Sequence, residues 1–226
     1  MSQALQPFAS LYNDRYIMIV ILQVKACQGS ARRSEMRYPP DQKKKAREAI
    51  IQAGARTLRQ KGFHGVGVDG LASAAGMTSG AFYSNFSSKD ALLEEVIDVF
   101  LGEPFLSEDG PAAEQRRILR DWLKTYLSTQ HRSEPASGCV IPSLSADVAR
   151  AKPAVRSAYG RKMHKFVRKI ADTLEGSKGD RERRAWSIVA LMVGAISISR
   201  AMPDGDDANR ALASALQSAT AMLGPN

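Results

Sequence analysis

From residue 39 onwards, apolar positions recur at three- and four-residue steps, the spacing of helices that bury one face. The first such segment follows Pro39-Pro40-Asp41, a helix-start signal, and closes at Lys61-Gly62, which predicts a helix of about five turns. Further helical segments are expected at 71–75, 78–84, 88–100, 112–129, 144–150, 154–174, 181–202 and 207–223. No run alternates convincingly as a strand, so the predicted fold class is all-α.

Glycine and proline divide these segments, because they terminate helices or favour turns. The expected breakers are 102–104, 110–111, 134–135, Gly138, Pro142, Pro153, 176–179 and 203–205.

The first 36 residues follow no such pattern and are an unassigned extension. Their most apolar stretch, 16–24, is nine residues long, about half of the roughly 20 needed to cross a bilayer. Met36 stands just before the first well-patterned segment, which suggests an alternative translation start.

Composition narrows the class of protein. A net charge of +9 rules out an acidic calcium buffer and favours a polyanionic partner, without choosing between nucleic acid and a membrane surface. Cys27 and Cys139 lie too far apart to form a disulfide framework, so a cytoplasmic setting is expected.

The segment 67–86, GVDGLASAAGMTSGAFYSNF, carries the functional signal. Ala72, Gly76 and Phe82 occupy positions where a helix-turn-helix needs a small residue, a turn residue and an apolar anchor. The second helix is short, with small polar side chains suited to a major groove. Lys89 adds a cation in the first turn of the next helix, where it opposes the helix dipole and where a phosphate would be bound favourably.

Residues 46–100 resemble the N-terminal domain of the TetR/AcrR family of bacterial transcriptional regulators. The resemblance rests on Gly62-Phe63, Leu71-Ala72, Ala75-Gly76, Gly80, Phe82-Tyr83, Phe86 and 88–92 (SKDAL). It implies a three-helix DNA-binding domain at 37–88, with its motif at 67–86, and a helical ligand-binding and dimerisation domain at 89–226. It also implies a homodimer, joined through the last two helices, that binds a palindromic operator in double-stranded DNA.

Transferred to this sequence, the resemblance predicts base contacts along the second motif helix and phosphate contacts around it. The predicted DNA-binding residues are Lys43, Lys44, Arg47, Asp69, Thr78, Ser79, Gly80, Ala81, Tyr83, Ser84, Asn85 and Lys89. The chain departs from the family pattern at Gly67 and Val68, which replace hydroxyl residues, and at Asn85, which stands where His or Tyr is usual. The basic run before the motif is therefore expected to contribute to affinity.

The C-terminal half is predicted to bind an unknown small-molecule effector that releases a repressor from its operator. The candidate ligand contacts are the small Cys139 and a set of large adaptable side chains: Trp122, Tyr126, Met163, Phe166, Trp186 and Met192. The apolar faces of the last two helices, which include Trp186, Ile196, Leu212 and Leu216, are the expected dimer interface.

Three alternatives remain open. A redox- or electrophile-sensing regulator would act through Cys139. An enzyme would need a His131, Cys139 and Asp147 triad, which has no recognisable motif context, so no catalytic residue, metal site or cofactor is expected. A peripheral membrane protein would use 16–24 and the basic region 32–47, although no membrane association is predicted.

Overall fold

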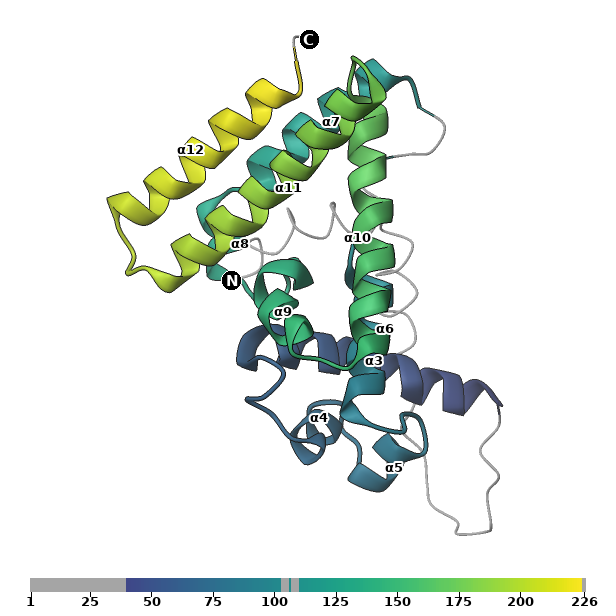
Figure 1. Cartoon of the computed structure of the whole chain (residues 1–226). Helices are drawn as coiled ribbons and strands as arrows, with labels where there is room; N and C mark the ends of the chain where they lie inside the picture. Colours follow the sequence, from purple (N-terminus) through teal and green to yellow (C-terminus); the bar gives the residue numbers. More distant parts are fainter. Residues whose placement is uncertain (1–39, 103–105, 107–109, 225–226) are drawn as a thin grey trace. The chain divides into compact units, whose positions relative to one another are not determined.

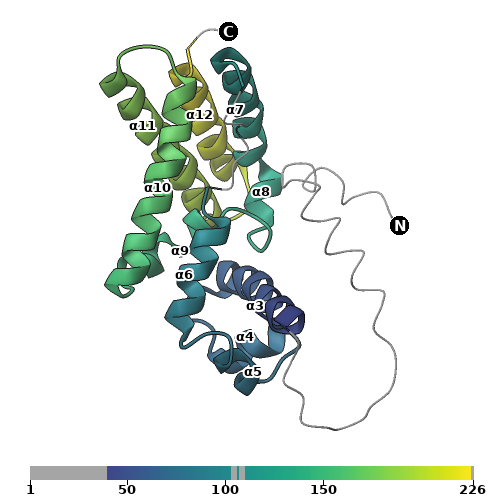
Figure 2. The same ribbon diagram turned by 90° about the vertical axis from the view of Figure 1, so that its right-hand side faces the viewer.

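The computed structural model of the chain describes residues 40–102, 106 and 110–224, and this part contains ten α-helices and no β-strand (Figures 1 and 2). The all-α prediction is confirmed. The expectations for 1–36, including Cys27, the apolar stretch and Met36, lie outside the described residues. The helices are α3 (Pro40–Lys61), α4 (Val68–Ala74), α5 (Ser79–Tyr83), α6 (Lys89–Phe100), α7 (Ala112–Tyr126), α8 (Thr129–Ser133), α9 (Val140–Ala149), α10 (Pro153–Thr173), α11 (Lys178–Ala201) and α12 (Asp206–Met222).

Helix α3 begins at Pro40 and ends where Gly62 adopts a left-handed conformation, with φ of +71°. The Gly62 N–H donates to the Leu58 carbonyl at 2.9 Å, which closes the last turn. Ile50 and Leu58 are fully buried, whereas Lys43 to Lys45 are exposed. The helix therefore extends one basic turn beyond the apolar stripe that predicted it.

Helices α4 and α5 form the expected helix-turn-helix around Phe82, which is fully buried. Gly76 takes a φ of +68° in the turn between them, and the Met77 N–H donates to the Ala72 carbonyl at 2.9 Å. Leu71 and Ala72 bury the inner face of α4. The close approach of the two helices thus depends on the small residue, the turn glycine and the aromatic anchor that the spacing indicated.

Helix α6 packs against both α3 and α10, and residues 40–226 form one compact unit. Leu92, Leu93, Val96 and Ile97 supply its buried stripe. Because α6 packs on helices from both sides of residue 88, the packing shows no break there. The boundary between a DNA-binding and a ligand-binding domain at residue 88 therefore remains a prediction.

Several boundaries differ from the sequence prediction. The segment expected as one helix at 112–129 is split into α7 and α8, because Ser128 caps a new helix by accepting from the His131 N–H at 3.2 Å. Pro142, expected as a breaker, lies in the first turn of α9. Proline is tolerated there because the first N–H groups of a helix have no partner within it. Gly179, also expected in a breaker, lies in α11.

Helices α7, α10, α11 and α12 pack into a bundle (Figure 2). By length and composition α11 would be long enough to cross a membrane, the one such helix in the described part of the chain. Ile188, Met192 and Ile196 nevertheless bury one side of it in the bundle. Its apolar composition is accounted for on that side by packing within the protein.

His131 is a buried polar anchor of this bundle, with 3% of its surface exposed. Its Nδ1 lies 2.7 Å from the Tyr126 carbonyl and its Nε2 accepts from the Cys139 N–H at 3.2 Å. The ring is therefore neutral, with its proton on Nδ1. Burial lowers the pKa of His131 from 6.5 to about 4, and the charges of Arg200 and Arg59 act in the same direction.

Acidification should therefore destabilise the protein between pH 6.5 and pH 4. Because the folded-state pKa lies below the unfolded one, the unfolded chain binds the proton first, and up to about 3 kcal/mol of stability is lost as the pH falls through this window. Urea unfolding measured across the window checks this, with His131→Gln expected to flatten the dependence. His164→Gln, at an exposed position, is the control. If His131→Gln lost as much stability between pH 6.5 and pH 4 as the wild-type protein, the lowered pKa of His131 would not be the cause.

Candidate nucleic-acid interface

The outer side of α5 presents the side chains predicted to contact bases. Thr78, Gly80, Tyr83 and Ser84 are exposed, with Tyr83 58% exposed, while Ser79 and Ala81 are half-buried. Thr78 is the N-cap, and its Oγ1 accepts from the Ala81 N–H at 3.2 Å. The helix thus has one buried face, formed by Phe82, and one accessible face that carries small groups and the Tyr83 ring.

Asp69 is connected directly to this face. The Ser79 hydroxyl donates to the Asp69 carboxylate, which joins the first turn of α4 to the first residue of α5. Because the Ser79 hydrogen is used in this bond, its oxygen remains as an acceptor for a base or water. Asp69 therefore has a positioning function in the structure, and its direct contact with DNA stays a prediction.

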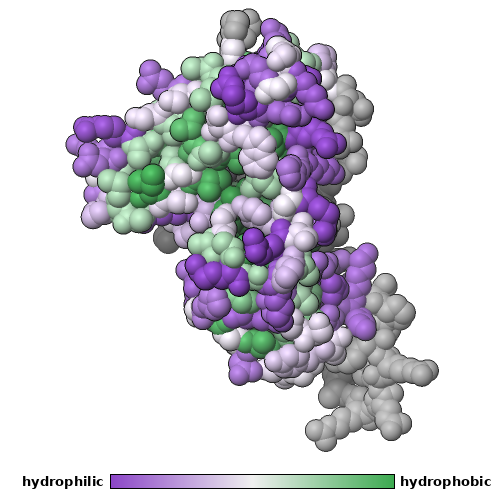
Figure 3. Space-filling model, viewed as in Figure 1, coloured by the Kyte–Doolittle hydropathy of each residue, from purple (hydrophilic) through white to green (hydrophobic). Residues whose placement is uncertain are grey.

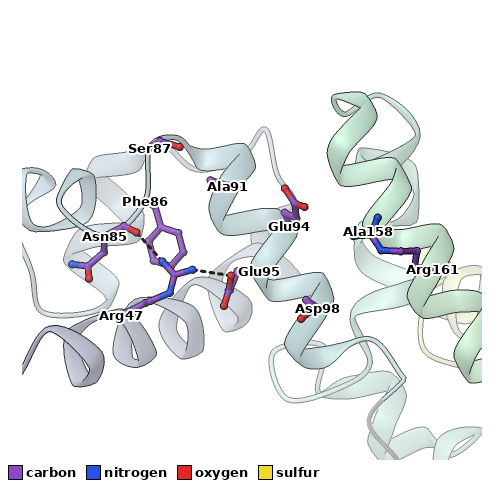
Figure 4. A pocket seen from close by; sticks show the side chains of 10 residues that line it. All are labelled: Arg47, Asn85, Phe86, Ser87, Ala91, Glu94, Glu95, Asp98, Ala158 and Arg161. Atoms are coloured by element: carbon purple, nitrogen blue, oxygen red, sulfur yellow. Dashed lines mark hydrogen bonds and ion pairs between the residues drawn. The ribbon is translucent and has the colours of Figure 1, made fainter. Parts of the chain in front are cut away.

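Arg47 holds the end of α5 against α6 (Figure 4). Its guanidinium donates to the Asn85 carbonyl and to Glu95 Oε2, both at 2.8 Å, and lies 4.3 Å from the centre of the Phe86 ring. The Asn85 amide in turn donates to the Ala81 carbonyl at 2.8 Å. Arg47 and Asn85 are thus used within the fold, whereas Lys43 and Lys44 are exposed near the start of α3.

Lys89 occupies the first turn of α6, as expected, and finds acceptors within the protein. Its Nζ donates to the Phe63 carbonyl and, at 2.8 Å, to the Val66 carbonyl, and it lies 4.1 Å from the centre of the Phe63 ring. These carbonyls belong to the turn between α3 and α4. The unfavourable dipole position is therefore offset by backbone acceptors, and a phosphate contact by Lys89 stays a prediction.

Most of the predicted ligand contacts come together in the bundle. The Trp122 ring centre lies 4.8 Å from that of Tyr126 and 6.3 Å from that of Phe166. Met163 and Met192 are buried, and Cys139 packs against the same core. Trp186 is 43% exposed on α11, with its ring 5.7 Å from that of His164, so it belongs to a different surface.

The predicted ligand contacts do not line either of two hollows among the described residues. One, of about 340 Å³, lies between α7 and α10 beside Lys165, Arg168 and Lys169. The other, of about 490 Å³, lies beside Glu94 and Arg161, where α6 faces α10 (Figure 4). Because the sequence prediction of ligand contacts was based on large apolar side chains, it did not include the charged residues that line these hollows. The four-residue spacing of Glu94 and Asp98 on α6 is the signal that could have indicated the hollow beside Arg161.

The His131, Cys139 and Asp147 side chains that the enzyme alternative requires do not form a catalytic triad in the structure. His131 accepts from the backbone N–H of Cys139 rather than from its thiol, and Asp147 accepts from the Phe63 N–H at 2.8 Å. Burial raises the pKa of the Cys139 thiol, which disfavours the reactive thiolate. Within the described part of the chain, no group of three or more His, Cys, Asp or Glu side chains is placed to hold a metal ion.

This geometry defines a helix-turn-helix protein with an attached helical bundle. A family model described as bacterial regulatory proteins, tetR family, matches residues 50–96. The HTH-type transcriptional repressor NemR of Escherichia coli (strain K12) is 28% identical over 165 residues, covering 66% of this chain and 81% of NemR. The HTH-type transcriptional repressor DhaR of Mycobacterium sp. (strain GP1) is 24% identical over 127 residues, covering 54% of this chain and 62% of DhaR.

Solved structures share the fold. The reduced form of E. coli NemR matches with a TM-score of 0.64 and 21% identity, over 80% of this chain and 98% of that one. FadR from Bacillus subtilis, in complex with stearoyl-CoA, matches with a TM-score of 0.58 and 15% identity, over 78% of this chain and 97% of that one. Residues 50–96 thus match the TetR family model, and the matching repressors and solved structures support a TetR/AcrR family transcriptional regulator.

The two carbonyl contacts of Lys89 generate a stability prediction that needs no DNA. Lys89→Met keeps the aliphatic stem but leaves the Phe63 and Val66 carbonyls without their donor, so the free energy of unfolding should fall by about 2 kcal/mol. Chemical denaturation measures this, with Lys61→Met, an exposed lysine in the last turn of α3, as the control. Equal stability of Lys89→Met and the wild-type protein would contradict it.

Proposed function

We propose that the protein is a ligand-responsive repressor that binds a palindromic operator as a homodimer and is released by a small-molecule inducer. The observation that carries the proposal is α5, a short helix anchored by buried Phe82 whose outer side chains are small, polar and accessible. Such a face fits the major groove, which is about 12 Å wide. Two relatives that are transcriptional repressors support the direction of regulation.

Charge supports DNA as the polyanionic partner. Eight basic and two acidic residues lie between positions 37 and 61, immediately before the helix-turn-helix. Lys43, Lys44 and Lys45 form an exposed basic end of α3 on the same domain. Cationic side chains there would bind phosphates without base preference, while α5 supplies the specificity. A protein with this target works in the cytoplasm.

The test is the binding of duplexes selected by the protein from a random-sequence pool. Enrichment of a palindromic sequence, and a Kd that rises steeply with salt, are expected because phosphate contacts release counterions. Fluorescence anisotropy from 50 to 300 mM salt measures both affinity and slope. Enrichment of no sequence, or equal affinity for selected and scrambled duplexes, would refute the proposal.

The accessible faces of α11 and α12 support the dimer. Trp186 and Ile198 are 43% and 57% exposed, and Ala190 is exposed between them, whereas Ile196 and Leu212 are buried within the chain itself. The proposed dimer interface therefore still lies on α11 and α12, but it is formed by their exposed residues and not by Ile196 and Leu212. Figure 3 shows apolar surface over these two helices. A Cβ added at Gly194 would meet no atom within 4 Å, so this face is also smooth enough for close packing.

Ile198→Glu should therefore convert the dimer into monomers. A carboxylate in a helix-helix interface would be desolvated without a partner, which we expect to weaken association at least tenfold. Sedimentation velocity at several concentrations measures this, with Ala113→Glu, an exposed position on α7, as the control. An unchanged dimer in Ile198→Glu would exclude this face.

The inducer is proposed to bind in the helical bundle. FadR holds stearoyl-CoA, so a protein of this fold accommodates a large ligand. The rings of Trp122, Tyr126 and Phe166, which pack against one another at tilted and edge-to-face angles, would have to separate to admit one, which couples binding to rearrangement of the bundle. Thiol sensing through Cys139 is the weaker alternative, since burial raises the pKa of that thiol.

A further inference from the structure

The turn between α3 and α4, residues 62–67, is held by charged side chains from two other helices. Phe63 and Val66 in this turn are buried, so their backbone groups have restricted access to water. Lys89 of α6 binds their carbonyls. The Phe63 N–H, the first after Gly62, donates to Asp147 Oδ2 of α9 at 2.8 Å, across 84 positions in sequence.

Local electrostatics does not explain the position of Asp147. A carboxylate near the C-terminus of α3 opposes the helix dipole, which favours cations at that end. Arg150 lies 3.1 Å from Asp147 and offsets part of this charge. What the carboxylate provides is a short, directional, charge-assisted hydrogen bond to a buried amide.

Helix α9 is fixed equally firmly to the bundle. The Ser145 and Tyr159 hydroxyls are 2.7 Å apart, which joins α9 to α10. At its other end the N-cap residue Cys139 donates its N–H to His131. Helix α9 also packs against α3, α10 and α11, so Asp147 connects the Phe63 amide to a helix that is anchored in the bundle.

The turn is also connected, through α4, to the surface that would face DNA. The turn leads into α4, whose Asp69 binds Ser79 at the start of α5. We infer that Asp147 is a positioning residue for DNA recognition, which ties the helix-turn-helix to the bundle through the Phe63 amide and sets the orientation of α5. This inference rests on the proposed function as a DNA-binding regulator.

The experiment compares four full-length proteins: wild type, Asp147→Ala, Asp147→Asn and Asp121→Ala. Asp147→Asn retains an oxygen that accepts from the Phe63 N–H. Asp121→Ala is the matched control, because Asp121 also bonds a cation three positions later in its helix, Lys124, but lies on α7 with an exposed side chain. Anisotropy measures affinity for a duplex selected by the wild-type protein, and hydrogen exchange measures protection of residues 62–67.

Asp147→Ala should bind the duplex about tenfold more weakly, the effect of one buried charge-assisted hydrogen bond. Exchange in residues 62–67 should accelerate in the same variant, and Asp147→Asn should restore both values to within threefold of wild type. Asp121→Ala should change neither. If Asp147→Ala does not fold, Asp147→Ser, whose hydroxyl is too short to reach Phe63, takes its place.

The inference fails if the variant that lacks the acceptor keeps wild-type affinity and exchange, or if Asp147→Asn is as defective as Asp147→Ala. A wild-type protein that selects no duplex would instead refute the proposed function. The exchange measurement needs no DNA, so it separates these two failures.

Discussion

Satisfying the buried backbone of the turn after α3 is the constraint on which the rest of the structure depends. Buried N–H and C=O groups need partners, and a turn cannot provide them all from its own residues. Here Lys89 and Asp147 supply opposite charges from two different helices to adjacent backbone groups. The same bonds that make the turn stable therefore fix where the helix-turn-helix stands on the bundle.

The basic side chains of the chain fall into two groups, those that are exposed and those that are paired with carboxylates. Near the start of α3, exposed lysines extend beyond the packed part of the helix and remain available to a polyanion. On α10 and α11, by contrast, several cations are engaged by neighbouring carboxylates, as Lys162 is by Asp98 and Arg184 by Asp180. The net charge of +9 favoured a polyanionic partner, but the exposed cations that would bind one lie on only part of the chain.

The sequence predicted those features that depend on residues close together along the chain. The helix-turn-helix around Ala72, Gly76 and Phe82 is confirmed because its geometry follows from local spacing. The backbone partners of Lys89, Arg47 and Asp147 lie from 23 to 84 positions away, so no local pattern could identify them. Lys89 illustrates the limit, since its position against the helix dipole led to the prediction of a phosphate contact, whereas in the structure its Nζ binds two backbone carbonyls.

The small size of α5 has a consequence for how such a protein changes over generations. A five-residue helix is too short to be stable by itself, so its shape is imposed by Phe82, by the Thr78 cap and by the contacts of Arg47. Gly80 has no side chain, and Tyr83 and Ser84 are exposed, so these positions add little buried surface to that support. Substitutions there cost little folding free energy, so new sequence preferences can be acquired while the scaffold stays intact.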